Sequence, residues 1–448
     1  MSENRAQFAT RLGVIATTVG SAVGLGNIWR FPFEAGVHGG GAFLLIDLFF
    51  IFVVGIPLVA AEFIIGRHTG LNVRGAFRKL APGKPWGIVG YSGLLASMLI
   101  LSFYSVVAGW TLEYICQSFT GFGGTATVDG LHNRFDAFAV SNWRPLMWTL
   151  IFLLINYFIL VRGVQKGIER MSNLLMPVFF VILLIFCINS LFMPGAREGL
   201  EFLFKPDFSK VTPEVMLGAM GQAFFSLSLG LGCMITYSSY FKRDTPLLKT
   251  AGIMASLDTL VAILAGIIIF PAVFTFGMEP SAGPKLVFEI LPSIFLQLPG
   301  SMIWSVLFFI LLFLASLSST ISMSEISIAY LTDEFGMSRR KATAVNIGLA
   351  MLLGSVCALS FGVLSDFKVF GMTVFNLFDY VSSNILLPLG GMIISIFVGW
   401  VLKRSVVNRE LTSGARGVRP WMVGAVIFCL RFVVPLCIAF VFVSGLLK

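Results

Sequence analysis

The sequence predicts an all-α polytopic membrane protein that crosses the bilayer eleven times. Of its 448 residues, 57% are hydrophobic and only 12% are charged. A soluble chain carries about twice that share of charged residues, so most of this surface must face lipid. Eleven apolar segments are each long enough to cross a bilayer, which takes about 20 helical residues.

The eleven segments follow one another along the whole chain. They lie at 12–35, 42–66, 88–119, 146–163, 171–194, 214–241, 250–277, 300–331, 343–365, 374–402 and 421–447. The first contains Gly and Asn instead of the unbroken apolar block of a signal peptide, so we expect it to be retained. The six cysteines fall in apolar stretches without metal-ligand spacing and are expected to be core residues.

The distribution of Lys and Arg predicts the orientation of these spans. With the N-terminus inside, the cytoplasmic connections hold most of the 31 Lys and Arg residues, as the positive-inside rule requires. The same bias accounts for the net charge of +9 without a nucleic-acid partner. An odd number of spans then places the C-terminus outside.

Glycine interrupts two of the spans in matching places. AVGLGN occupies 22–27 in the first span, and SLSLGLGC occupies 226–233 in the sixth. Glycine permits the non-helical backbone of a break, and the polar groups that a break frees must line a cavity that satisfies them. Paired breaks are typical of a binding site at the membrane midplane. The alternative is that these glycines only permit close helix packing; two matching breaks favour the site.

Several motifs together resemble the neurotransmitter:sodium symporter family, most closely its bacterial amino-acid members with eleven spans. They are the run at 20–33, GGGAF at 39–43, Glu62 in GIPLVAAEFIIGR, GQAFFSLSLG at 221–230 and TYSSY at 236–240. The likeness covers nearly the whole chain in the family's order. It implies the LeuT-type fold, a 5+5 inverted repeat with helices 1 and 6 broken.

The resemblance also implies how the chain is divided. A single transporter domain would cover 1–448. Its first repeat would span about 11–195, its second about 213–402, and an extra span would follow at about 421–447.

Two sodium sites are implied by the resemblance. The first would combine the substrate carboxylate with the Ala22 carbonyl, Asn27, Ser226 and Asp258. The second would combine the carbonyls of Gly20, Val23 and Ala315 with the hydroxyls of Ser318 and Ser319. All are hard oxygen donors, which suit a hard cation. For the serines alone, the alternative is a hydroxyl that bonds back to its own helix.

Asp258 stands where many relatives have Asn. A carboxylate inside a span is costly and needs a partner. A structural ion pair is one reading, although the sixth and seventh spans contain no basic residue. Animal relatives bind chloride beside the first sodium site, and some bacterial ones carry a Glu where this chain has Ala262. We therefore expect Asp258 to supply the negative charge and uptake to be independent of chloride.

The resemblance implies a substrate pocket for an amino acid. Its lining would be Ala22, Gly24, Gly26, Ile100, Tyr104, Phe225, Ser228, Leu231, Ser319 and Met323. Gly24 replaces the Asp of monoamine transporters and leaves the exposed amides of the break to a carboxylate, to which Tyr104 would donate its hydroxyl. Leu231 and the flexible Met323 suggest a roomy pocket for large apolar side chains, aliphatic or aromatic, although they could also pack tightly.

Two gates are implied in the same way. The outer pair would be Arg30 and Asp379, with Gln222 nearby and Phe225 as the lid over the substrate. The inner pair would be Arg5 and Asp333, with Ser239 and Tyr240 as partners. The alternative for Arg5 is a topology charge alone.

Glu62, Glu113 and Glu325 are placed within predicted spans. Glu62 is expected to accept hydrogen bonds from the unwound backbone of the sixth span, and Glu325 to lie near the inner gate. No role is assigned to Glu113.

The resemblance therefore implies a symporter that uses sodium ions to import a hydrophobic L-amino acid by alternating access. A membrane amino-acid sensor of the same fold is the alternative; the intact sodium sites and gates argue against it. A membrane enzyme lacks a catalytic constellation, because His38, His68 and His132 lie near span ends or in loops. A channel lacks a selectivity-filter sequence. The loop at 120–145 has no Cys and no glycosylation sequon, which favours a bacterial inner membrane.

Overall fold

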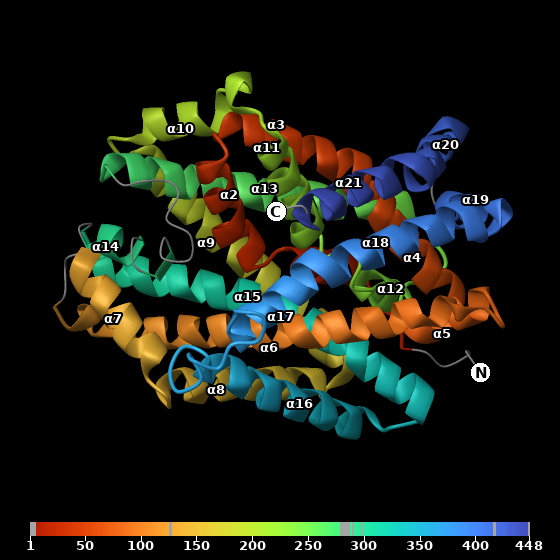
Figure 1. Cartoon of the computed structure of the whole chain (residues 1–448), viewed down its shortest axis with the longest axis horizontal. Coiled ribbons are helices and arrows are strands. Elements are labelled where there is room, and N and C mark those ends of the chain that lie inside the picture. The colour runs from red at the N-terminus through yellow and green to blue at the C-terminus, as the bar shows by residue number, and fades with distance from the viewer. Residues whose placement is uncertain are drawn as a thin grey trace.

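The computed structural model of the chain is a bundle of helices (Figure 1). It describes residues 6–124, 128–277, 287–288, 291–296, 299–414 and 418–446. Across these residues, eight continuous helices are long and apolar enough to cross a membrane, and two bent helix pairs raise the number to as many as ten. The predicted all-α polytopic class is therefore confirmed.

Each predicted span contains a helix or a pair of helices. In order they are α1 (Arg11–Ala22) with α2 (Phe31–Val37), α3 (Gly41–Phe50) with α4 (Ile56–Thr69), α6 (Ile88–Phe119), α8 (Arg144–Leu160), α9 (Arg170–Leu191), α11 (Pro213–Ser226) with α12 (Cys233–Ser238), α13 (Leu247–Thr275), α15 (Ser301–Phe335), α16 (Arg339–Leu359), α17 (Val374–Tyr380) with α18 (Leu387–Ile396), and α20 (Pro420–Phe428) with α21 (Val434–Leu446). The connecting helices are α5 (Val73–Leu80), α7 (Val128–Val140), α10 (Ala196–Phe204), α14 (Leu291–Leu296) and α19 (Arg404–Thr412).

The first span is broken where its glycines predict. α1 begins with Thr10 as N-cap, whose side chain accepts a hydrogen bond from the amide of Gly13, and it ends at Ala22. Val23 is extended, and a short π-helical turn from Gly26 to Arg30 leads into α2. The two halves meet at 50°, so backbone polar groups are exposed inside the bundle.

The sixth span is broken more widely, between the end of α11 and the start of α12. Ser228, Gly230 and Gly232 all have positive φ angles, of 52°, 81° and 77°. For serine this left-handed conformation costs about 1–3 kcal/mol. Gly230 has a further reason to be glycine, because an added Cβ would lie 2.3 Å from the carbonyl oxygen of Leu387 in α18.

The two breaks face the long helices α6 and α15, which pack along each other through the centre of the bundle (Figure 1). α1 packs against α9, α13 and α15, and α12 packs against α4. These contacts place the breaks at the middle of the molecule, away from its lipid-facing surface.

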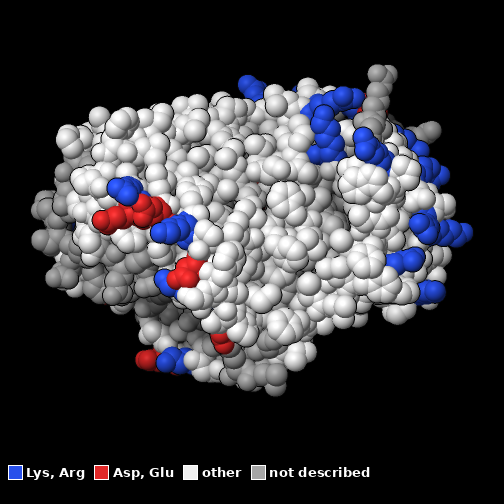
Figure 2. All heavy atoms as spheres, turned by 90° about the horizontal axis from the view of Figure 1, so that it is seen from above, with Lys and Arg blue, Asp and Glu red and all other residues white. Residues whose placement is uncertain are grey.

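Charged side chains gather toward the two ends of the molecule. Figure 2 shows Lys and Arg concentrated at the end that carries α5 and α19, whereas the middle of this face is almost uncharged. The described N-terminal residues lie at the same basic end (Figure 1). An uncharged belt between charged ends is the pattern expected of a chain that crosses a membrane.

Candidate functional site

A small cavity of about 20 Å³ lies between the two breaks. The ten residues that the sequence nominates for the substrate pocket all line it, although their roles remain predictions. Ser226 and Leu387 complete the wall. Ser226 is predicted from the sequence as a sodium ligand. Leu387 was not predicted, because it comes from α18 and belongs to no recognisable motif.

One end of this cavity is polar. The amide of Leu25, freed by the break, donates to the Tyr104 hydroxyl at 2.9 Å. Gly24 allows this approach, because an added Cβ would lie 2.6 Å from Ser319 Oγ and 2.8 Å from Tyr104 Oη. The break therefore lies directly against α6 and α15, and its Leu25 amide is bonded to a side chain of the cavity wall.

The residues of the first proposed sodium site form one buried hydrogen-bonded cluster. Asn27 Nδ2 lies 2.8 Å from Asp258 Oδ1 and 3.0 Å from Ser226 Oγ, and Ser226 donates to Asp258 Oδ2 at 2.6 Å. No ion pair within the described residues involves Asp258, so the structure does not support a structural ion pair. Asn27 Oδ1 accepts a hydrogen bond from the Gly24 amide at 3.0 Å. The carboxylate of Asp258 and the hydroxyl of Ser226 are hard oxygen donors, which suit a hard cation.

The residues of the second proposed sodium site also lie together. The hydroxyls of Ser318 and Ser319 point to the Val23 carbonyl at 3.5 and 3.2 Å. Ser318 also donates to its own helix at the Ala315 carbonyl, at 3.0 Å. A Cβ on Gly20 would lie 3.4 Å from Ser318 Cβ. Back-bonding within α15 is therefore only part of what these hydroxyls do, since both also reach the break of the first span.

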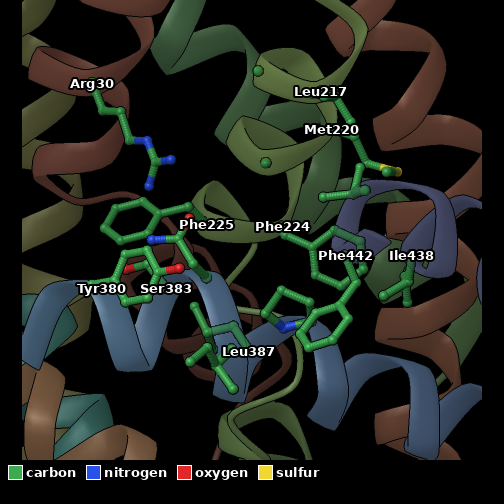
Figure 3. A pocket seen from close by; sticks show the side chains of 16 residues that line it. Arg30, Leu217, Met220, Phe224, Phe225, Tyr380, Ser383, Leu387, Ile438 and Phe442 are labelled. Atoms are coloured by element: carbon green, nitrogen blue, oxygen red, sulfur yellow. The ribbon is translucent and has the colours of Figure 1, made fainter. Parts of the chain in front are cut away.

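Phe225 separates the central cavity from a second, outer cavity, because it lines both. Arg30 and Asp379 both line this outer cavity of about 300 Å³. Among the described residues, no ion pair joins the two side chains. Arg30 lies over the Phe225 ring at 4.6 Å (Figure 3), with its Nε 3.6 Å from Glu34. Asp379 instead accepts a hydrogen bond from Ser383 at 2.8 Å. The predicted outer pair is thus apart in this conformation.

Gln222, predicted near the outer gate, has a different partner. Its side-chain amide donates to the Gly26 carbonyl at 3.2 Å and so joins α11 to the break of the first span.

The inner side is closed by the N-terminal segment. The ring of Phe8 meets those of Tyr237 and Tyr240 edge-on, at 6.0 Å each, and its amide donates to the Tyr240 carbonyl. Glu169 accepts hydrogen bonds from the amides of Ala9 and Thr10 at 2.8 and 3.1 Å. Neither Phe8 nor Glu169 belongs to a sequence motif, so neither contact is predictable from the sequence.

The predicted inner gate is described only in part, because Arg5 lies outside the described residues. Asp333 accepts hydrogen bonds from the backbone and side chain of Asn72, at 2.9 and 3.1 Å. Ser239 donates to the Thr236 carbonyl in its own helix.

Glu325 is held near the inner gate by two neighbours. Tyr240 donates to it at 2.7 Å, and Arg339 binds both of its oxygens, at 2.7 and 2.6 Å. From the sequence, Arg339 looks like a topology charge, so this bidentate pair was not anticipated.

Glu62 and Glu113 each connect neighbouring helices of the bundle. Glu62 accepts a hydrogen bond from the amide of Gly230 at 2.9 Å, as predicted for the unwound sixth span. Glu113 pairs with Arg144 and accepts hydrogen bonds from Gln117 at 2.7 Å and Trp148 at 2.5 Å. It therefore joins α6 to α8, far from the cavity.

The sequence of the chain is similar to those of known sodium-dependent transporters. The family model described as "Sodium:neurotransmitter symporter family" matches residues 5–129 and 125–448. A sodium-dependent transporter of Bacillus subtilis, YhdH, is 39% identical over 445 residues, covering 99% of this chain and 98% of the relative. Human sodium- and chloride-dependent GABA transporter 2 is 26% identical over 99% of this chain and 80% of its own.

A solved structure is similar over its whole length. The crystal structure of MhsT in complex with L-phenylalanine has 46% sequence identity and a TM-score of 0.91, covering 99% of this chain and 100% of that one. The predicted LeuT-type fold is therefore confirmed. The chain belongs to the sodium:neurotransmitter symporter family, whose members are sodium-coupled transporters and not enzymes.

Proposed function

We propose that the protein imports a hydrophobic L-amino acid, aliphatic or aromatic, by sodium symport across a bacterial cytoplasmic membrane. The observation that carries the proposal is the cavity between the two breaks, polar at one end and apolar at the other. The Leu25 amide and the Tyr104 hydroxyl meet at the polar end. Ile100, Leu231 and Met323 contribute apolar walls.

The charge of the wall supports an amino acid over an amine. No Asp, Glu, Lys or Arg is among the described residues that line the cavity, so an amine without a carboxylate would find no counter-charge there. An amino acid brings its own carboxylate, to which the Tyr104 hydroxyl can donate while it accepts the Leu25 amide. The L-phenylalanine bound to MhsT supports an aromatic side chain at the apolar end.

Sodium would bind at two sites and couple to the substrate at the first. The Asn27–Ser226–Asp258 cluster adjoins the cavity through Ser226, so a substrate carboxylate and a sodium ion there would bind cooperatively. Such coupling is reciprocal, since each ligand raises the affinity of the other by the same factor. Asp258 would supply the negative charge, and uptake would not depend on chloride.

The same proposal includes the orientation in the membrane. The basic end near α5 and α19 (Figure 2) would face the cytoplasm with the N-terminus. The C-terminus would lie outside, and alternating opening of the two sides would carry the substrate inward.

The test is uptake into proteoliposomes that contain the purified protein. An inward sodium gradient should drive accumulation of radiolabelled L-phenylalanine or L-leucine, and a potassium gradient should not. Competition by each of the twenty amino acids should show inhibition by hydrophobic ones and none by charged ones. Sodium-dependent binding without any uptake would instead support a sensor and overturn the proposal.

A further inference from the structure

A cavity of about 270 Å³ lies at the basic end of the molecule, where α4, the connection that follows α12, and α19 meet. Its lining is polar throughout and consists of Arg67, His68, Arg243, Arg409, Glu410 and Ser413. None of these residues lines the central cavity. This basic pocket is therefore a separate feature, which the proposed transport cycle does not use.

Hydrogen bonds hold the walls of the basic pocket together. Arg67, whose side chain is only 2% exposed, donates to Glu410 Oε2 at 2.8 Å and to the Arg243 carbonyl at 3.5 Å. His68 Nδ1 lies 3.0 Å from Glu410 Oε1, and the Ser413 hydroxyl donates to the Arg243 carbonyl at 3.0 Å. These bonds join three segments that are far apart in the chain, so the pocket is formed before any ligand binds.

The positive charge of the basic pocket exceeds its negative charge. Of the described residues that line it, three are arginines and one, Glu410, is a carboxylate. Glu410 is paired with Arg67. Among the described residues, the guanidiniums of Arg243 and Arg409 have no hydrogen-bond or ion-pair partner, and the neighbouring Asp244 pairs with the start of α1 instead. Two cations that line one pocket therefore lack an anion.

Two guanidiniums without partners in one pocket favour a phosphate group as the ligand. A guanidinium is planar and presents its N–H groups in a fork that matches phosphate oxygens through two parallel hydrogen bonds. The oxygens of a phosphate are arranged tetrahedrally. One phosphate can therefore accept hydrogen bonds from guanidiniums that belong to two different elements, here Arg243 in the connection after α12 and Arg409 in α19.

The depth of the basic pocket indicates a lipid as the source of that phosphate. α4 ends the apolar span Gly41–Thr69, and α19 begins at Arg404, shortly after the span Val374–Val401 ends. The pocket therefore lies where the hydrocarbon of the bilayer gives way to the head groups. Trp400 and Trp421 flank the segment that carries α19 and are 57% and 66% exposed, and exposed Trp is typical of this layer. The phosphate groups that are abundant at this depth belong to phospholipids.

We propose that the basic pocket binds the head group of an anionic phospholipid of the cytoplasmic leaflet, with the lipid phosphate at Arg243 and Arg409. The excess positive charge favours phosphatidylglycerol over phosphatidylcholine, whose head group carries a cation of its own. A phosphate held by both arginines joins the connection after the sixth span to α19, so the bound lipid stabilises the folded protein. The choice of leaflet rests on the proposed orientation, but the binding itself does not.

Binding is tested by native mass spectrometry of the full-length protein in detergent, titrated with phosphatidylglycerol or with phosphatidylcholine of the same acyl chains. The first molecule of phosphatidylglycerol should bind at least tenfold more tightly than that of phosphatidylcholine. Arg243→Gln combined with Arg409→Gln removes the charge-assisted hydrogen bonds and should weaken this binding at least tenfold, and each single variant should show an intermediate loss. Arg404→Gln, at an exposed residue of the same helix and outside the pocket, is the matched control and should bind like the wild type.

Stabilisation by the lipid gives a second readout in nanodiscs. Phosphatidylglycerol should raise the melting temperature of the wild type by several degrees relative to phosphatidylcholine, because a ligand that binds only the folded state stabilises it. The double variant should lose this difference. Its melting temperature in phosphatidylcholine should equal that of the wild type, which establishes that it is folded.

Equal binding of the two lipids by the wild type would overturn the proposal, as would undiminished binding of phosphatidylglycerol by the folded double or single variants. Inorganic phosphate at the same concentration as the lipid should not displace it. Displacement would assign the pocket to a soluble anion and would also overturn the proposal. None of these measurements requires transport, so they decide the lipid site whether or not the proposed function holds.

Discussion

Asn27 and Asp258 meet inside the bundle, with Asn27 Nδ2 2.8 Å from Asp258 Oδ1. The contact joins the broken first span to α13, and Ser226 of the broken sixth span completes it. Three separate elements thus converge on one carboxylate, whose hydrogen-bond partners Asn27 and Ser226 are uncharged.

The first prediction concerns this charge. Wild-type uptake should be the same when gluconate replaces chloride. Asp258→Asn removes a charged acceptor, which is worth about 1.5–3 kcal/mol, so the sodium affinity should fall at least tenfold and chloride should now stimulate uptake. Ser226→Ala is the matched control, since it removes a ligand but keeps the charge, and it should show no chloride stimulation. A steep chloride requirement in the wild type would refute the assignment.

The second prediction concerns the close approach at Gly24. Gly24→Ala places a Cβ 2.6 Å from Ser319 Oγ, so sodium-dependent binding of labelled L-phenylalanine should fall at least tenfold. Gly348→Ala in α16 is the control, because nothing lies within 4 Å of its added Cβ, and it should bind normally. Scintillation proximity binding measures both. Equal affinities would mean that the break does not form the substrate site as proposed.

The third prediction concerns the inner closure. Phe8 is 1% exposed, and truncating a buried Phe to Ala costs about 3–5 kcal/mol. That cost falls on the conformation in which the N-terminal segment is docked, so Phe8→Ala should shift the population toward an open inner side. Hydrogen–deuterium exchange of the peptide from α1 should become several-fold faster. Leu12→Ala, at a residue 68% exposed, should leave exchange unchanged; similar rates in both variants would contradict the role of Phe8.

The fourth prediction concerns Glu410 in α19, which pairs with Arg67 at 2.8 Å and contacts His68 at 3.0 Å. Burial raises the pKa of Glu410, but the His68 hydrogen bond and the Arg67 charge together hold that pKa below its ordinary value of 4.5. A lowered pKa in the folded state stabilises the fold above the ordinary value, and this stabilisation is lost as the pH falls through the folded pKa.

The measurement is the thermal stability of the wild type and Glu410→Gln between pH 3 and 8. The variant should melt several degrees lower at neutral pH, and the difference should shrink as the pH falls below 4.5 and through the lowered pKa of the folded carboxylate. Glu201→Gln, in an exposed pair with Arg197, should match the wild type throughout. If the difference in melting temperature between the wild type and Glu410→Gln instead grew as the pH fell, the pKa of Glu410 would not be lowered in the folded state.

The breaks and their glycines were predictable because the signal is local. A Gly-Leu-Gly inside an apolar segment is visible without any knowledge of what packs against it. The hydrogen bond from the Gly230 amide to Glu62 followed from the same reasoning, because a freed amide inside a membrane protein needs an acceptor.

The contacts that the sequence did not reveal join residues far apart in the chain. Leu387 lines the central cavity only because α18 crosses the break of the sixth span, and Phe8 closes the inner side only because the N-terminal segment packs on α12. Arg339 sits in a basic cluster, so its charge looked like an orientation signal until Glu325 was found beside it. Such contacts depend on how the helices pack against one another, and the pattern of hydrophobic residues along the chain does not reveal that packing.

The conformation could not be predicted either. Arg30 and Asp379 have the same identities whether the outer side is open or closed. Only the structure shows that Asp379 accepts a hydrogen bond from Ser383 and that the Arg30 guanidinium lies over the Phe225 ring.

The contact of Gly230 with α18 has a mechanical consequence. An added Cβ on Gly230 would meet the Leu387 carbonyl at 2.3 Å, and one on Gly390 would meet the Gly230 carbonyl at the same distance. Two backbones that touch in this way leave no room for a side chain between them, so alanine at Gly230 or Gly390 would push the break of the sixth span away from the first turn of α18.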